Sequence, residues 1–72
     1  MSSPQKMCEI RLNGQSSPTS ASTVLELLEE LKLLGRPVAV ERNREIIFKE
    51  SYQDTPILPG DAIEIIQCVG GG

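Results

Sequence analysis

The residues that could take part in chemistry are few, and the most distinctive are the last four, Val69-Gly70-Gly71-Gly72. Successive glycines bring no side chain to a core and have wide backbone freedom. They offer the α-carboxylate of Gly72, which an extended chain could hold roughly 10 Å beyond the preceding body. Such a narrow arm suits insertion into another protein's active site. A frayed terminus or a cloning linker would have the same composition, so the rest of the chain must decide.

The other candidate groups exclude several kinds of site. The chain has no histidine, so the usual acid–base group and metal ligand near neutral pH is missing. Cys8 and Cys68 lie far apart without a CxxC pair, which argues against a metal site. We interpret Cys8 as a small core residue. Cys68 is predicted to be an exposed thiol, either ordinary or able to react with a partner.

Composition and charge restrict the class of protein. With 39% hydrophobic and 24% charged residues, the chain is typical of a folded globular domain rather than a disordered one. It has no apolar run that could cross a bilayer and no signal-peptide pattern, so we expect a cytoplasmic protein without a membrane partner. The net charge of -3 disfavours nucleic acid and favours a basic patch on a protein partner.

The first elements are predicted to form a hairpin after a loose leader, residues 1–6. Apolar and charged side chains alternate over residues 7–12, which is the period of a half-buried strand. Asn13-Gly14 is a strong signal for a two-residue hairpin turn. Residues 15–21 would return as a second strand, and Pro18, which has no N–H, places that strand at a sheet edge.

A helix is predicted from residue 24 to about residue 34. Thr23 and Glu26 form a T-x-x-E capping box, and Gly35 with Pro37 would end the helix. The apolar residues fall at helical spacing and form one face, which we interpret as core: Val24, Leu27, Leu28, Leu31 and Leu34.

The second half of the chain is predicted to hold three strands. Residues 37–41 suit a central strand, which turns at 42–44 into a short paired strand at 45–48. A long connection follows, anchored by Tyr52, Ile57 and Leu58, and packing is the default for both aromatic residues, Phe48 and Tyr52.

The last strand, residues 62–69, is predicted to lead directly into the arm. Alternation points Ile63 and Ile65 toward the helix and turns Glu64, Ile66 and Cys68 away from it. Because Cys8 and Cys68 should face opposite sides of the sheet, no internal disulfide is expected. We predict that Ile66, with Val69 and Cys68, contributes to a partner-binding patch. The alternative is that Ile66 is a lone exposed apolar residue.

This order of elements predicts an α+β fold, with one helix across a mixed sheet of four to five strands. That is the pattern of the β-grasp, or ubiquitin-like, fold. From Met7 to Gly72 the chain also resembles the ThiS family of sulfur carriers of thiamine biosynthesis. The resemblance is carried by LNG (12–14), TVLELLEEL (23–31), VAVERNREII (38–47) and GDAIEIIQCVGGG (60–72). Its most specific part is GD-x-IEI together with the terminal VGGG.

The resemblance implies a chemistry for Gly72, whose carboxylate is an unreactive anion at neutral pH. A ThiF-like adenylating enzyme would use ATP to form an acyl-adenylate. A sulfur donor such as a cysteine desulfurase would then leave a thiocarboxylate, and thiazole synthase would receive the sulfur. A Cβ at Gly71 or Gly72 would hinder the attacking group. The chain would be a co-substrate with no catalytic residue of its own, and it would bind no cofactor. It would consist of a leader (1–6), a β-grasp domain (7–69) and a flexible arm (70–72).

Three alternatives remain open at this point. The small subunit of molybdopterin synthase usually has a proline pair before its terminal glycines, where this chain has residues 65–68 (IIQC). A ubiquitin-like modifier would use the same end group but would form a bond to lysine. A β-grasp interaction module with an inert tail would tolerate removal of Gly72, whereas a carrier would not.

Overall fold

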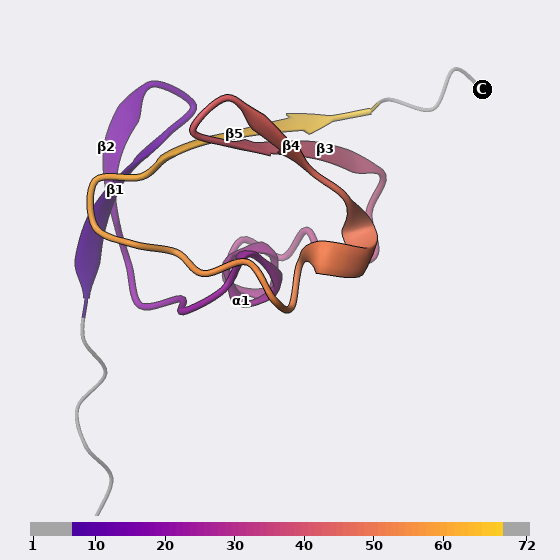
Figure 1. The fold of residues 1–72 in the computed structure, drawn as a ribbon, viewed down its shortest axis with the longest axis horizontal. Helices are drawn as coiled ribbons and strands as arrows, with labels where there is room; N and C mark the ends of the chain where they lie inside the picture. Colours follow the sequence, from indigo (N-terminus) through magenta and orange to yellow (C-terminus); the bar gives the residue numbers. More distant parts are fainter. Residues whose placement is uncertain (1–6, 69–72) are drawn as a thin grey trace, which may run out of the picture.

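The computed structural model describes residues 7–68, in which one helix lies across one face of a five-stranded mixed sheet (Figure 1). The strands follow the order β2-β1-β5-β3-β4, and only β1 and β5 run parallel within this sheet. The elements in chain order are β1 (Cys8–Leu12), β2 (Gln15–Thr19), α1 (Val24–Glu30), β3 (Val38–Arg42), β4 (Glu45–Ile47), the 3-10 helix η1 (Lys49–Ser51) and β5 (Ala62–Gln67). This arrangement confirms the predicted fold class, including the edge position of the strand that contains Pro18. The predicted leader and residues 69–72 lie outside the described residues, so the domain boundaries stay predictions.

Both hairpins turn through two residues with positive φ. These are Asn13 and Gly14 (51° and 82°) between β1 and β2, and Asn43 and Arg44 (52° and 72°) between β3 and β4. Two positive φ values are typical of type I′ turns, whose twist matches that of the flanking strands. Each asparagine side chain also accepts a bond from β5, Asn13 from Ile65 N at 2.8 Å and Asn43 from Ala62 N at 2.9 Å. The two turns therefore fasten their hairpins to the central strand.

The helix begins as predicted, with one difference in its cap. Thr23 Oγ1 accepts a bond from Glu26 N at 3.2 Å, which is the first half of a capping box. The Glu26 carboxylate accepts from Ser22 N at 2.7 Å, one residue before the expected partner. Thr23 itself pairs with Pro56 in an isolated bridge, so the loop before β5 is joined to the start of the helix.

The predicted end of the helix at Gly35 is wrong, because α1 ends at Glu30. Lys32 takes a left-handed conformation (φ 61°) directly after the capping residue Leu31. Two backbone bonds of the Schellman type close this end, from Lys32 N to Glu29 O (3.0 Å) and from Leu33 N to Leu28 O (2.8 Å). Lysine thus occupies the position for which glycine is the usual choice.

Gly35 belongs instead to a separate turn after the helix. Its φ is 84°, and the bond from Arg36 N to Leu33 O (3.0 Å) closes the turn around it. Leu34 therefore does not continue the apolar face of α1, and its side chain is 46% exposed.

The core lies between α1 and the sheet face that it covers. Its fully buried members come from the helix and the three central strands, namely Ile10, Val24, Leu27, Leu28, Val40 and Ile63. Tyr52 and Ile57 are buried, as predicted, but Leu58 and Phe48 are exposed. Each of these two follows a residue packed on the core, so alternation of the extended backbone turns it outward. Among residues 7–68 no helix has the length and apolar character needed to cross a membrane.

Candidate functional site

The candidate site is the end of β5, together with the sheet face that α1 leaves uncovered. Ile63 and Ile65 are buried against the core, whereas Glu64 is exposed and Ile66 is 61% exposed. The predicted orientation of this strand is therefore confirmed. The function assigned to these residues from the sequence stays a prediction.

Cys68 is the last residue that the structure describes before the predicted arm. Its backbone N–H donates to Pro37 O at 2.8 Å, so the chain is held beside β3 up to this point. Its side chain is exposed, as predicted, whereas Cys8 is half-buried against the core, and both are free thiols. Val69 and the three glycines lie outside the described residues, and Gly72 follows Cys68 by four positions.

Ile66 is not a lone exposed residue. Ala39 lies directly opposite it on β3 and is also exposed. On the far side of β3, Ile46 and Phe48 are 62% and 68% exposed. Because residues 46 and 48 alternate with the half-buried Ile47, both side chains face the same side as Ile66. We call these four residues, Ala39, Ile46, Phe48 and Ile66, the outer patch.

Sequence reasoning missed most of the outer patch. The sequence predicts packing for Phe48 and only a short paired strand for residues 45–48. The signal was present in the run Ile46-Ile47-Phe48, because three apolar residues on an edge strand cannot all face one core.

Asp61 fixes the loop from which β5 begins. The side chain is buried and accepts from Arg42 Nε at 2.8 Å, from Asn43 Nδ2 at 3.1 Å and from Leu58 N at 2.8 Å. Burial by itself would raise the pKa of Asp61. The bonds from Leu58, Asn43 and Arg42, together with the charge of Arg42, outweigh burial and lower this pKa below its ordinary value.

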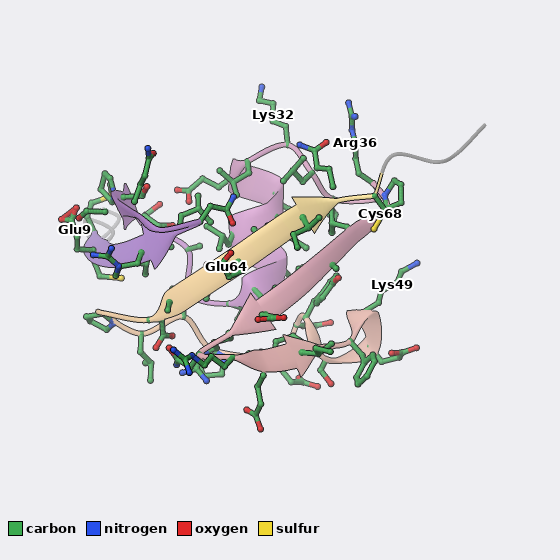
Figure 2. All side chains as sticks on the ribbon, turned by 90° about the horizontal axis from the view of Figure 1, so that it is seen from above. Glu9, Lys32, Arg36, Lys49, Glu64 and Cys68 are labelled. Carbon is green, nitrogen blue, oxygen red and sulfur yellow. The ribbon has the colours of Figure 1, made fainter. Side chains whose placement is uncertain are left out.

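Basic side chains collect at the other end of β5. Figure 2 shows Arg36 and Lys49 on either side of the end of the strand near Cys68, whereas Lys32 lies beside the end of α1 and Glu9 lies at the opposite end of the molecule. Nearby, burial raises the pKa of the Tyr52 hydroxyl, and the neighbouring Cys68 and Glu50 add to the effect. Within residues 7–68, no group of three or more acidic or cysteine side chains is placed to hold a metal ion.

Comparison with known proteins agrees with this fold. The sequence model of the ThiS family matches residues 9–72. The sulfur carrier protein ThiS of Bacillus subtilis is 40% identical over 65 residues, covering 88% of this chain and 98% of that protein. Thiazole synthase of Paramagnetospirillum magneticum is 47% identical over 62 residues, but this chain spans only 19% of that protein.

A solved structure gives the same result. The crystal structure of the thiamine biosynthesis protein ThiS from Geobacter metallireducens has a TM-score of 0.75 and 34% sequence identity. The likeness covers 89% of this chain and 99% of that chain, so the β-grasp fold is shared throughout. The family match and the near-complete coverage of these small relatives show that this chain belongs to the ThiS family.

Proposed function

We propose that this chain is a sulfur carrier of thiamine biosynthesis and that it holds the sulfur as a thiocarboxylate on Gly72. The observation that carries the proposal is the family match, which extends through the glycines to residue 72. The names of the small relatives support the assignment to thiamine rather than molybdopterin, because two of them are sulfur carrier proteins ThiS. The cytosolic location expected from the sequence stays part of the proposal.

The chemistry requires three steps at the terminal carboxyl. A carboxylate oxygen of Gly72 attacks the α-phosphate of ATP on a ThiF-like enzyme, and pyrophosphate leaves. The outer sulfur of a persulfide, such as one on a cysteine desulfurase, then attacks the acyl carbon and displaces AMP, which gives an acyl disulfide. A thiol finally cleaves the S–S bond, is itself oxidised to a disulfide, and releases Gly72 as a thiocarboxylate with sulfur in place of one carboxylate oxygen. The chain itself acts as a co-substrate and supplies no catalytic group.

The folded body of the chain would supply the binding energy. Ordering each backbone residue of the arm costs about 1–2 kcal/mol, so inserting several residues into a narrow active site opposes binding. The outer patch offers apolar surface that a partner could remove from water, and each fully buried isoleucine or phenylalanine is worth about 1.5–3 kcal/mol. We therefore assign partner binding to Ile66 and its neighbours in the outer patch, with Val69 and Cys68 beside the arm.

Thiazole synthase is the proposed acceptor of the sulfur. Two proteins of that name contain a segment similar to this chain, with 47% and 37% identity, and in each the matched length is about a fifth of the protein. Joining two partners in one polypeptide raises the effective concentration of each for the other. Such a fusion is useful when the two partners act together. This observation supports a functional association between the carrier and the synthase.

Intact-mass measurement tests the proposal. The chain is incubated with a ThiF-like enzyme, ATP and a sulfur donor, and we expect its mass to rise by the difference between one sulfur and one oxygen. A variant lacking Gly72, checked for unchanged folding, should show no such rise. No mass change in the full chain, under conditions in which a ThiS protein of another organism is converted, would refute the proposal. Thiazole formation with thiazole synthase then tests the pathway.

A further inference from the structure

A groove opens at the end of the molecule where β5 finishes, next to the C-terminal end of α1. Its volume is about 450 Å³. The lining is mainly apolar and comes from α1, the turn after it, β3 and the loop after η1, with Leu25, Leu33, Leu34, Pro37, Val38 and Tyr52 among its members. Leu34 leaves nearly half of its surface exposed here, because it lies in the turn after α1 and not on the helix.

Two exposed cations, Arg36 and Lys49, line the same groove. Figure 2 shows these two side chains beside Cys68. Within residues 7–68 the ion pair that forms is Arg42–Asp61, so neither Arg36 nor Lys49 is in an ion pair with a described carboxylate. Glu50 follows Lys49 in the chain and is a carboxylate at this end, but the two cations exceed it, so the rim of the groove is locally basic although the chain as a whole carries a charge of -3.

The groove touches the point from which the arm departs. Pro37 lines the groove, and its carbonyl accepts the bond from Cys68 N at 2.8 Å. Figure 2 shows Cys68 between Arg36 and Lys49. Anything bound in the groove therefore lies next to the last residue before Val69 and the glycines.

We propose that this groove docks an acidic segment of thiazole synthase, one apolar side chain of which enters the groove while flanking carboxylates pair with Arg36 and Lys49. The inference rests on the proposed function and adds the chemistry of the partner's surface. The net charge alone favours a basic partner surface, whereas the local charges at this end require an acidic one. Docking at the root of the arm orients the arm toward the synthase active site.

Other occupants fit the groove less well. A second copy would bring two basic rims together in chains that already repel each other. The arm itself, residues 69–72, has one apolar side chain, that of Val69 at its root. Charge complementarity therefore favours an acidic partner segment.

The experiment compares two charge reversals of equal size. Arg36→Glu/Lys49→Glu alters the groove, and Arg11→Glu/Arg44→Glu alters cations at the start of β5, a strand length of about 20 Å away. Affinity for thiazole synthase is measured at increasing salt, starting near 0.1 M, where charges farther apart than about 10 Å are largely screened. We expect the groove variant to bind roughly tenfold more weakly and with less dependence on salt. The control should stay within about threefold of the wild type.

Several results would overturn the inference. Equal weakening of both variants would indicate general electrostatic attraction, and no weakening of either would leave the groove without this role. Tighter binding by the groove variant would show that the arm occupies the groove, and loss of a dimer in sedimentation would show a second copy there. Thermal unfolding checks that both variants fold, and Arg36→Gln/Lys49→Gln should give an intermediate loss if reversal perturbs the fold.

The mass measurement keeps this inference separate from the proposed function. If the wild-type chain gains no sulfur, the proposed function fails whatever the groove does. If the chain gains sulfur but the groove variant binds the synthase normally, only the groove inference fails.

Discussion

At the scale of single residues, Asp61 connects the end of β3 to the loop that precedes β5. Its carboxylate holds Arg42 and Asn43 at the end of β3 and Leu58 in the preceding loop. Asn43 in turn holds Ala62 at the start of β5. Asp61 therefore holds together the end of β3, the preceding loop and the start of β5, at the opposite end of that strand from Cys68.

Replacing Asp61 with Asn should lower the free energy of unfolding by about 1–3 kcal/mol near neutral pH, because buried donors lose a charged acceptor. The lowered pKa of Asp61 also fixes the sign of a pH effect. Its contribution is fully present above the unfolded pKa of about 3.9 and is lost as the pH falls through the folded pKa. Chemical denaturation between neutral and acid pH should therefore show a smaller loss of stability in the variant than in the wild type.

Asp54 provides the matched control, since it is exposed and its carboxylate accepts no hydrogen bond within residues 7–68. Asp54→Asn should change the unfolding free energy by no more than about 0.5 kcal/mol. Equal effects at both positions would mean that the Asp61 network does not stabilise the loop.

At the scale of elements, both hairpins turn through two residues with a left-handed backbone, but the second of these residues differs in type. Gly14 and Arg44 occupy equivalent positions, with φ of 82° and 72°. A Cβ added at Gly14 would meet no heavy atom within 4 Å. A side chain at this position would therefore lower stability through the strained left-handed backbone and not through a clash with other residues. A left-handed conformation costs a residue with a Cβ about 1–2 kcal/mol, which Arg44 bears.

Arg44→Gly should therefore raise the free energy of unfolding by about 0.5–1 kcal/mol, after the entropy that glycine loses on folding is subtracted. Gly14→Arg should lower it by about 1 kcal/mol. Urea denaturation of the two variants measures both changes. If both substitutions changed the free energy of unfolding in the same direction, backbone strain in the turns would not explain the changes.

At the scale of the whole molecule, α1 covers one sheet face and the other carries the outer patch, to which we assign partner binding. Ile65 and Ile66 are neighbours of identical chemistry, yet one is 7% and the other 61% exposed. The same substitution at each of the two positions therefore distinguishes the effect of the core on stability from the effect of the outer patch on binding.

Ile66→Asp should leave stability within about 1 kcal/mol of the wild type while weakening binding to thiazole synthase roughly tenfold or more. Ile65→Asp should unfold the domain, because an unpaired charge in the core costs several kcal/mol and small domains have little more stability than that. Circular dichroism and binding measurements distinguish the two outcomes. Normal affinity of the folded Ile66 variant would exclude the outer patch from the interface.

The sequence by itself determined the elements whose signals are local. The period of two in β1 and β5, the Asn13-Gly14 turn and the Thr23 cap each depend on residues close together in the chain, so their order alone led to the β-grasp fold. The exposure of Ile66 followed from the same alternation. These patterns, with the terminal glycines, were also enough to recognise the ThiS family.

Only the tertiary structure decided the features that depend on residues distant in sequence. The left-handed Lys32 ends α1 one turn before Gly35, because the backbone bonds from Lys32 N and Leu33 N back to the last turn close the helix there. That early end exposes Leu34 and creates the basic groove beside Cys68. The outer patch likewise exists because β3 brings Ala39 between Ile66 and the edge strand β4. The outer patch joins residues of three strands, and the groove joins α1 and the turn after it to β3 and η1, so no local pattern encodes either surface.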